Sequence, residues 1–255
     1  MGKISWKPGT MVYPIPAVLV SCGDMEKNNI FTVAWTGTVN TDPAMTYISV
    51  RPERYSYDII KKTGEFVINL TTKELAFATD YAGVTSGKNV NKVEKLGLHL
   101  EKCNNVSAPM IKESPISIEC KVVEIKELGS HHMFLAEVKS VNVDEKYMDE
   151  TGRFNMEECN LIAYSHGRYY TLGENIGKFG FSVKKKWQKS LKNINIILEI
   201  FYFIFHYTSR QKIYKKSFFN NVPNEVDTEK RVPYHWVHFL YNKIQRCYVL
   251  YEYFL

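Results

Sequence analysis

The stretch NIFTVAWTGTVNTDPAMTYISVRPERYSYDII, residues 29–60, contains the strand signals that decide the fold. Two sets of side chains alternate along its first part: Ile30, Thr32, Ala34 and Thr36 on one face, and Phe31, Val33, Trp35 and Gly37 on the other. This alternation is typical of one half-buried strand, because successive side chains of a strand point to opposite faces. The turn signal TDP then separates it from a second β-rich run, AMTYISVR. The stretch therefore predicts two strands joined by a short turn.

Strand signals continue through the first 186 residues of the chain. Further β-branched or apolar runs are PAVLVSCG, GEFVINL, SPISIECKVVEIKEL and HMFLAEVKSVNVD. Helical patterns are fewer: RYSYDIIKKTG, TKELAFATDYAG, in which Gly83 is expected to end the helix, and VNKVEKLG. Many strands with few helices predict a mainly β fold, an antiparallel barrel that carries helical excursions.

The charge of the chain is concentrated at its C-terminal end. The 255 residues are 45% hydrophobic and 24% charged, which is ordinary globular composition, and the net charge is +6. Residues 1–186 hold 23 Lys+Arg against 22 Asp+Glu, whereas residues 187–255 hold 10 against 5. A nearly neutral body gives little electrostatic support for binding nucleic acid, so we expect no nucleic-acid partner.

Cysteine is sparse in this chain: Cys22, Cys103, Cys120, Cys159 and Cys247. The number is odd and no two cysteines form a CxxC pair, so neither a disulfide framework nor a zinc site is predicted. The N-terminal residues MGKISWKPGTMVYP contain no apolar segment of a secretory signal. We therefore expect free thiols, no metal and a cytoplasmic location, with Cys120 as a buried thiol on an alternating strand.

Residues 187–255 differ in composition from the rest of the chain. They contain no Gly, Ala or Met but 17 of the 35 aromatic residues. Three interpretations remain open: a read-through or frameshifted C-terminus, an appended helical segment, or a membrane-associated tail. The most apolar stretch, INIILEIFYFIFHY, is short and interrupted by Glu199, so it does not predict a membrane span. We divide the chain into a body, 1–186, and an atypical aromatic and basic tail, 187–255, whose structure the sequence does not predict.

The stretch WTGTVN is a candidate site for a flat ring. Its six residues are Trp35, Thr36, Gly37, Thr38, Val39 and Asn40. Small side chains let a ring lie against the backbone, whose N–H and C=O groups can then recognise the polar edges of the ring. The strand that follows this stretch leads to a second cluster of polar groups.

The second cluster suits a phosphate group. The stretch SVRPERYS supplies Ser49, Arg51, Arg54, Tyr55 and Ser56. An arginine fork donates two parallel charge-assisted hydrogen bonds to a phosphate, and a helix capped by Ser56 would add free N–H groups. The alternative is a solvated strand end with surface arginines and an ordinary helix cap, and the residues alone leave both open. A ring site one strand away from a phosphate site would suit a mononucleotide-like ligand.

Seven segments in order carry a family resemblance. They are YPIPAVLVSCG, the stretch 29–60, GEFVINL, ATDYAGVTSGKNVNKVEKLGL, SPISIECKV, LGSHHMFLAEV and IAYSHGRYYTLGENIGKFGFSVKK. Together they resemble the flavin reductase-like, FMN-binding split-barrel family, and most of all its flavoredoxin branch, over nearly all of residues 10–185. The resemblance implies an antiparallel split β-barrel of six or seven strands, a homodimer, and one FMN per subunit near the dimer interface.

The resemblance also implies roles for individual residues. Residues 35–40 would line the isoalloxazine ring, and Arg51, Tyr55 and Ser56 would hold the phosphate and ribityl chain, with Arg54 at the border of the site. The remaining implied contacts are Thr85, Ser86 and Lys92 as secondary cofactor ligands, His131 near the flavin face, and His166, Arg168 and Tyr169 on the substrate side. Structural alternatives remain: a strand-end histidine at His131 or His132, a helix-surface lysine at Lys92, and packing or solvent contact for YSHGRYY.

The function implied by the resemblance is flavin redox chemistry. We expect an NAD(P)H-dependent oxidoreductase that passes a hydride through N5 of FMN to a small-molecule or protein acceptor. The first alternative is a flavoredoxin-type electron carrier reduced by a partner protein. An alternative of another class is a β-barrel module that binds nucleic acid, which would need a basic groove with exposed aromatic residues.

Overall fold

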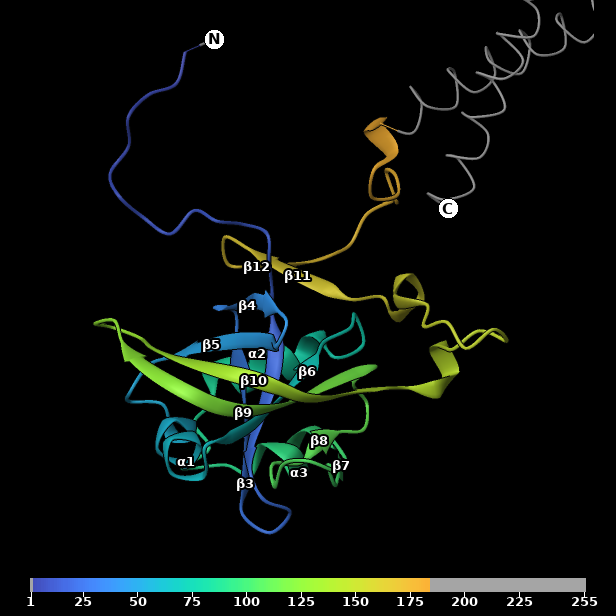
Figure 1. Cartoon of the computed structure of the whole chain (residues 1–255). Coiled ribbons are helices and arrows are strands. Elements are labelled where there is room, and N and C mark those ends of the chain that lie inside the picture. The colour runs from blue at the N-terminus through green and yellow to red at the C-terminus, as the bar shows by residue number, and fades with distance from the viewer. Residues whose placement is uncertain (1, 184–255) are drawn as a thin grey trace, which may run out of the picture. The chain divides into compact units, whose positions relative to one another are not determined.

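The computed structural model describes residues 2–183 (Figure 1). The chain divides into two units, Met1–Asn175 and Ile176–Leu255, and the second is described only over residues 176–183. The tail 187–255 and its three interpretations lie outside the described residues, so the boundary after residue 186 stays a prediction. None of the helices in the described residues is long and apolar enough to cross a membrane.

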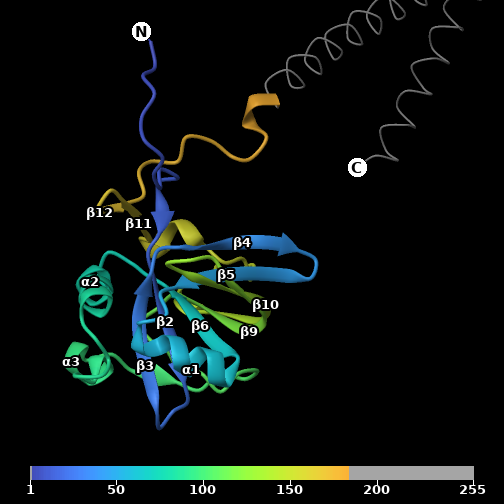
Figure 2. The same cartoon turned by 90° about the vertical axis from the view of Figure 1, so that its left-hand side faces the viewer.

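A seven-stranded antiparallel sheet forms the barrel of the first unit (Figures 1 and 2). Its strands, in spatial order, are β3 (Asn28–Val33), β2 (Val18–Gly23), β6 (Glu65–Leu70), β9 (Ile116–Glu127), β10 (His132–Val143), β5 (Ala44–Val50) and β4 (Thr36–Thr41). Every neighbouring pair runs antiparallel. The mainly β, antiparallel split barrel predicted from the sequence is confirmed.

Two small sheets and three helices complete the described part of the fold. The first sheet joins β1 (Ile15–Pro16), β11 (Ile162–Ser165) and β12 (Arg168–Thr171), and the second pairs β7 (Leu100–Glu101) with β8 (Met110–Ile111). The helices are α1 (Tyr55–Thr63), α2 (Ala76–Val84) and α3 (Lys92–Leu96), with 3-10 turns at Glu145–Tyr147 and Met156–Cys159. Figure 2 shows α2 and α3 on the same side of the barrel, next to β3.

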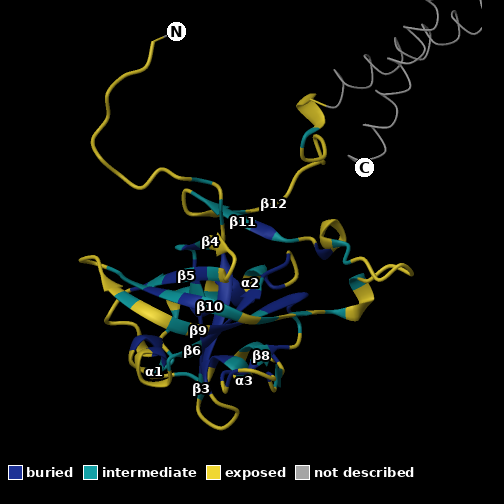
Figure 3. Ribbon diagram, viewed as in Figure 1, coloured by how far each residue is buried: buried dark blue, intermediate teal, exposed yellow. Residues whose placement is uncertain are grey.

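Strand β2 is buried along its whole length because it separates two apolar cores. Buried residues gather in the middle of the barrel, whereas the loops around it are exposed (Figure 3). Val18 and Val20 belong to the barrel core together with Phe134. Leu19 packs instead with Ala82 of α2, in a second core beneath the helices. A strand buried on both faces has a continuous apolar run in its sequence, as VLVSCG does. Burying one such aliphatic side chain stabilises the fold by about 1.5–3 kcal/mol.

The prediction of one continuous alternating strand over NIFTVAWTGTVN is wrong. Strand β3 ends at Val33, β4 begins at Thr36, and the two strands lie at opposite edges of the sheet. The backbone N–H of Thr36 donates to the carbonyl oxygen of Ala34 at 3.1 Å, a three-residue turn of the kind found at strand ends. The alternation continues through this corner, so the sequence period alone did not reveal the change of strand partner.

The predicted helix cap at Ser56 is also wrong. A cap at Ser56 would start the helix at Tyr57, but α1 begins two residues earlier, at Tyr55, and its N-cap residue is Arg54, which makes no side-chain cap hydrogen bond. Ser56 lies inside the first turn and is buried, because its hydroxyl accepts a hydrogen bond from the side chain of Asn29 on β3. A tertiary partner has therefore replaced the local capping role that the residue type suggested.

Gly83 does not end its helix as expected. Helix α2 continues to Val84, and its C-cap residue is Thr85. A Cβ added at Gly83 would lie 3.3 Å from Cβ of Thr32 on β3. Glycine is therefore required here for the close approach of helix to strand, rather than for a left-handed cap.

Candidate functional site

The candidate site lies at the barrel corner where β3 ends, β4 begins and β5 ends. The backbone N–H of Ser49, near the end of β5, donates to the carbonyl oxygen of Trp35 at 2.8 Å. The chain leaves β5 at Val50, passes Arg51 and enters α1. The predicted ring stretch and the predicted phosphate stretch therefore meet at one backbone hydrogen bond.

Only the first half of the ring stretch stays at this corner. Gly37 pairs with Tyr47, whereas Asn40 pairs with Met45 close to the β4–β5 turn. A six-residue strand such as β4 is roughly 20 Å long at about 3.3 Å per residue. The ring stretch thus divides into a part at the corner, Trp35, Thr36 and Gly37, and an exposed part that leads away from it, Thr38, Val39 and Asn40.

The backbone of β4 is better placed to bind a ligand than its hydroxyl groups are. The hydroxyl of Thr36 donates to the carbonyl oxygen of Tyr47 at 2.6 Å, so its proton is already used. A Cβ added at Gly37 would approach the Tyr47 ring to 3.3 Å, so the glycine lets the Tyr47 side chain lie over the strand at this point. Because β4 is an edge strand with β5 as its sheet neighbour, its outward N–H and C=O groups have no partner in the sheet.

Aromatic rings from three parts of the chain gather at the same corner. The ring of Tyr13 lies 6.2 Å from Trp35 and 4.9 Å from His166, measured between centroids. His166 and Gly167 form the two-residue turn between β11 and β12, and both have positive φ, of 46° and 75°. This turn, typical of a tight hairpin, places the imidazole of His166 against Tyr13.

The other two predicted substrate residues occupy the strand after this turn. The hydroxyl of Tyr169 donates to Asp80 of α2 at 3.2 Å, and its ring lies 5.5 Å from that of Tyr164. Burial, followed by the charge of Asp80, raises the pKa of Tyr169 to about 12, so it remains a neutral donor. Arg168 is exposed at the start of β12. Tyr169 is thus tied to α2, and His166 is the member of the predicted trio that joins the aromatic corner.

Arg51, Arg54 and His131 form a cluster at the end of β5 that we call the cationic corner. His132 pairs with Val50 across β10 and β5, which brings the next residues, His131 and Arg51, out of the sheet together. Nη1 of Arg51 lies 3.2 Å from Oε1 of Glu53, and both side chains are more than half exposed. Burial, and after it the positive charge of Arg51, lowers the pKa of His131. An imidazole with a lowered pKa is mostly neutral at pH 7 and gains a proton when an anion approaches.

The N-terminus of α1 faces this cationic corner with no side-chain cap. Arg54 is its N-cap residue, and the guanidinium of Arg54 donates to the carbonyl oxygen of Gly83 at 2.8 Å. Free N–H groups at the start of a helix favour an anion, and the adjacent arginines add to this preference. Ser56 is buried and its hydroxyl accepts from Asn29, so this hydroxyl is not directed to such a ligand.

The segment between α2 and α3 closes over these elements. Thr85 is partly buried and Ser86 is exposed at the start of the segment. A Cβ added at Gly87 would lie 2.2 Å from Oδ1 of Asn29 and 2.8 Å from Cδ1 of Tyr55. Backbone at Gly87 therefore packs directly on β3 and α1. Lys92 ends the segment as a buried residue, which excludes the helix-surface alternative.

The two neighbouring histidines have different surroundings. The side chain of His132 packs against Tyr57 of α1. Its Nδ1 lies 2.8 Å from the hydroxyl of Tyr57, and its ring packs edge-on against the same tyrosine. His131 is partly exposed, and its Nδ1 lies 3.0 Å from Oγ of Ser130. The strand-end packing role therefore belongs to His132, and His131 is the one beside Arg51 and Arg54.

Four residues of this region were not predicted from the sequence: Tyr13, Asn29, Asp80 and Gly87. Tyr13 stands in the YPIP segment at the start of the family resemblance, which was a usable signal. Asn29 is a polar residue at the start of an apolar strand, and only the fold shows that its amide reaches Ser56. Asp80 and Gly87 carry no local signal, because their partners lie far away in the sequence.

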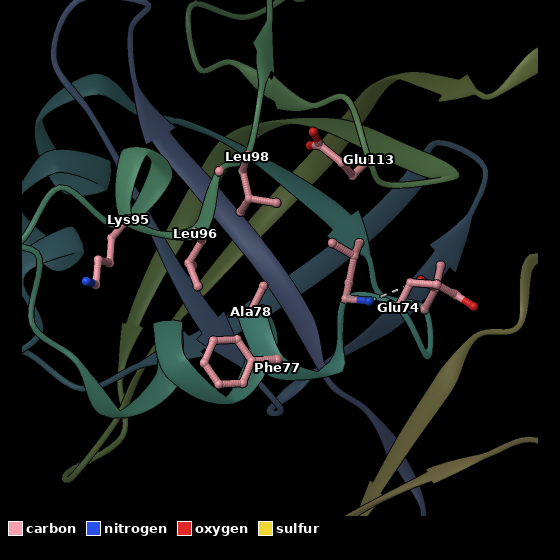
Figure 4. A pocket seen from close by; sticks show the side chains of 10 residues that line it. Glu74, Phe77, Ala78, Lys95, Leu96, Leu98 and Glu113 are labelled. Carbon is pink, nitrogen blue, oxygen red and sulfur yellow. Dashed lines mark hydrogen bonds between the residues drawn. The ribbon is translucent and has the colours of Figure 1, made fainter.

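A separate cleft of about 380 Å³ lies between α2 and α3 (Figure 4). Its lining is mixed, with Leu75, Ala78, Leu96 and Leu98 as the apolar part, Glu74, Glu113 and Lys95 as the charged part, and Phe77 beside them. None of the predicted site residues lines it. Over residues 2–183 no group of three or more His, Cys, Asp or Glu side chains could hold a metal ion.

The donor set at the barrel corner fits a flavin mononucleotide. Helix α1 starts without a side-chain cap hydrogen bond at its N-cap residue Arg54, and Arg51 precedes it by three residues, which provides for a phosphate group. The edge strand β4, whose outer side has no strand neighbour in the described sheet, and the indole of Trp35 before it provide for a tricyclic ring. The hydrogen bond from Ser49 to Trp35 joins the two parts.

Comparisons with known proteins agree with this chemistry. The model of the flavin reductase-like domain matches residues 10–173. A protein of Archaeoglobus fulgidus is 35% identical over 160 residues, which cover 63% of this chain and 89% of that protein. The NADH-dependent FMN reductase AsuE2 of Streptomyces nodosus is 23% identical over 145 residues, covering 56% of this chain and 77% of the reductase.

Solved structures give the same result. The flavoredoxin of Desulfovibrio vulgaris superposes with a TM-score of 0.66 and 31% identity, covering 72% of this chain and all of that chain (100%). The flavoredoxin of Methanosarcina acetivorans superposes with a TM-score of 0.67 and 26% identity, covering 72% of this chain and 99% of that one. Both similarities extend over the barrel that carries the candidate site.

Proposed function

Because this chain belongs to the flavin reductase-like family, we propose that it is an FMN-binding oxidoreductase that takes a hydride from NAD(P)H and delivers electrons to an acceptor. The observation that carries the proposal is the meeting of an edge strand and a cationic helix start at one barrel corner, joined by the hydrogen bond between Ser49 and Trp35. A ring and a phosphate group belong to the same ligand, and these two surfaces are adjacent.

The cationic corner would hold the phosphate group. Arg51 forms an exposed ion pair with Glu53, which costs little free energy to break. Once this pair is broken, the guanidinium of Arg51 can bind the phosphate. The first-turn N–H groups of α1 add two or more neutral donors. His131 supplies a further hydrogen bond and takes up a proton as the anion binds, because its pKa is lowered in the free protein. Ser49, Tyr55, Thr85 and Ser86 border this corner.

The ring would lie along the first half of β4, against Trp35 and Gly37. When bound, FMN supplies the hydride-accepting atom, N5, and needs no protein nucleophile. The chain's own part is to orient the ring through backbone N–H groups and to stabilise negative charge at its polar edge. Tyr13 covers one side of Trp35, His166 packs against Tyr13, and the two rings would exclude water from the nicotinamide or acceptor.

A flavoredoxin-type carrier is the second candidate. It is favoured by the two flavoredoxin structures, which cover 72% of this chain. In this case a partner protein, rather than NAD(P)H, would reduce the flavin. The geometry of the corner is compatible with both donors, so the electron donor must be measured.

A visible absorption spectrum tests the common part of the proposal. The purified protein should carry FMN or bind it with a characteristic change of the flavin bands. Anaerobic mixing with NADH and with NADPH then separates the candidates, since bleaching within seconds supports the reductase and slow or absent bleaching supports the carrier. Failure to bind any flavin, combined with affinity for single-stranded DNA, would support the nucleic-acid module and overturn the proposal.

The proposal includes a homodimer in a reducing cytoplasm. Large apolar side chains are exposed along the N-terminal segment, with exposed fractions of 91% for Ile4, 73% for Trp6 and 84% for Val12, and a second copy would cover them. The four described cysteines, Cys22, Cys103, Cys120 and Cys159, are buried free thiols, in keeping with reducing conditions. Sedimentation of the flavin-bound protein tests the dimer, and a monomer at micromolar concentration would exclude it.

A further inference from the structure

The buried lysine at the start of α3 satisfies the end of a different helix. Nζ of Lys92 donates to the carbonyl oxygens of Ala82 and Thr85, both at 3.2 Å, and the residue is only 3% exposed. Carbonyl groups in the last turn of a helix have no partner within that helix. Lys92 of α3 therefore donates to carbonyl groups at the end of α2, whose own last turn contains no basic residue.

Arg54 binds the same helix end from the other side. Its guanidinium donates to the carbonyl oxygen of Gly83 at 2.8 Å. We call the two cations, Lys92 and Arg54, together with these three carbonyl groups, the α2 clamp. The loop 85–91 leaves the clamp, packs on β3 and α1 through Gly87, and returns to Lys92. Both ends of the loop are thus fixed by one ammonium group.

The charge state of Lys92 does not decide whether the clamp holds. The charged and titratable groups that act on Lys92 are Arg54 of the α1 cap and Cys22 of β2. Burial, followed by the charge of Arg54, lowers the pKa of Lys92 to about 8. Burial raises the pKa of Cys22 to about 12, so its thiol remains neutral. An amine that has lost its proton still has two N–H donors, which is the number that Ala82 and Thr85 require.

We propose that Lys92 is a positioning residue, which holds the loop 85–91 closed over Asn29 and Tyr55 and acts on the cofactor through this loop instead of touching it. The inference rests on the proposed function, since it concerns the same corner. It differs from the contact that the family resemblance implied, because the donors of Lys92 are directed to main-chain carbonyl groups inside the clamp. The loop forms one wall of the cationic corner, so its closure governs how long a ligand stays bound.

The first test uses the flavin-free protein and needs no ligand. Hydrogen exchange of the amides of residues 84–91 is compared in the wild type, in Lys92→Met and in Lys88→Met, whose lysine is exposed in the same loop. Loss of two hydrogen bonds should raise exchange in Lys92→Met about tenfold or more. The Lys88→Met control should exchange as the wild type does. Equal exchange in all three proteins would overturn the clamp.

The second test separates positioning from contact with a phosphate. Affinity is measured for FMN and for riboflavin, which lacks the phosphate group. Lys92→Met should weaken both by the same factor, about tenfold, mainly through faster dissociation. A loss for FMN with unchanged riboflavin affinity would identify Lys92 as a direct phosphate ligand and overturn the proposal.

A second variant opens the loop without changing the lysine. In Gly87→Ala the new methyl group would lie 2.2 Å from Oδ1 of Asn29, so the loop must move outward. It should reproduce both results of Lys92→Met, including the equal losses for FMN and riboflavin. Should Lys92→Met not fold, Gly87→Ala alone decides, and unchanged flavin affinity in it would overturn the proposal. A wild type that binds no flavin but shows the exchange result would retain the clamp and contradict the proposed function instead.

Discussion

The side-chain amide of Asn29 donates a hydrogen bond of 2.6 Å to the hydroxyl of Ser56, and both residues are buried. This bond ties β3 to the first turn of α1. In Ser56→Ala the amide of Asn29 would lose its acceptor in a place without water, which should lower the free energy of unfolding by about 1–3 kcal/mol. Urea denaturation measures the loss. Ser107→Ala, at an exposed position, is the matched control and should change stability by less than about 0.5 kcal/mol.

Arg51 should be the main phosphate ligand. Arg51→Ala should weaken FMN binding by about 1.5–3 kcal/mol, the value of a hydrogen bond to a charged group, and leave riboflavin binding nearly unchanged. Titration calorimetry or flavin fluorescence gives both constants. Lys62→Ala, an exposed lysine in the last turn of α1, controls for net charge. Equal effects of the two substitutions would reduce Arg51 to a general electrostatic contribution.

His131 should make flavin binding respond to acid. Its pKa is lowered in the free protein by burial and by Arg51, and a bound anion favours its protonated form. The affinity of the wild type for FMN, relative to that of His131→Gln, should therefore rise as the pH falls through the pKa of His131, below the ordinary value of 6.5. The ratio of the two constants removes the titration of the phosphate itself. A ratio that stays constant between pH 5 and 8, roughly the interval in which histidines titrate, would mean that His131 does not face the ligand.

Lys92 should make the protein more stable as the pH rises above about 8. Its pKa is lowered to about 8 in the folded state, from 10.5, so above pH 8 the unfolded state binds more protons. Stability should then gain about 1 kcal/mol by pH 9 relative to Lys92→Met, in which this gain is absent. Above pH 9 the buried thiols act in the opposite direction, because the pKa of Cys22 and that of Cys120 are raised from 9.0 to about 12. Chemical denaturation of both proteins at pH 7, 8 and 9, roughly the span of this titration, measures the difference.

Removing residues 187–255 should leave flavin binding intact. All the candidate site residues lie within Met1–Asn175, which forms one unit of the chain. The shortened protein should bind FMN with unchanged affinity and keep the oligomeric state of the full chain, as measured by sedimentation. Loss of a flavin-binding dimer would show that the tail is part of the working protein.

The barrel could be predicted because its strands carry their signal locally. Runs such as GEFVINL and AMTYISVR were placed within one or two residues of β6 and β5. The cationic corner could also be predicted, because Arg51 and Arg54 lie close together in the sequence at a strand end. Period-two alternation, however, passed unbroken through Ala34 and Trp35, where the chain changes its strand partner.

The unpredicted parts of the site depend on contacts between distant segments. The amide of Asn29 reaches Ser56, and Tyr169 reaches Asp80, across 27 and 89 positions of the chain. A hydroxyl before a helix suggests a cap, but the competing partner on β3 can be seen only in the fold. Gly83 likewise suggests a helix end from its residue type alone, although in the fold its backbone approaches β3 closely. Residue type predicted the chemistry of the corner, and tertiary packing decided which atoms remain available.

Because β2 lies between two cores, a ligand bound at the corner would affect the thermal stability of the whole unit. Val18 and Val20 stabilise the barrel, whereas Leu19, on the same strand, stabilises the helical layer. Arg51 is attached to the first of these cores, and the loop beside Lys92 to the second, so a ligand that contacts both would couple them. Binding at the corner would then raise the melting temperature of the whole unit in one cooperative step that shifts with ligand concentration. A simple thermal shift assay would in this way read out occupancy of the site.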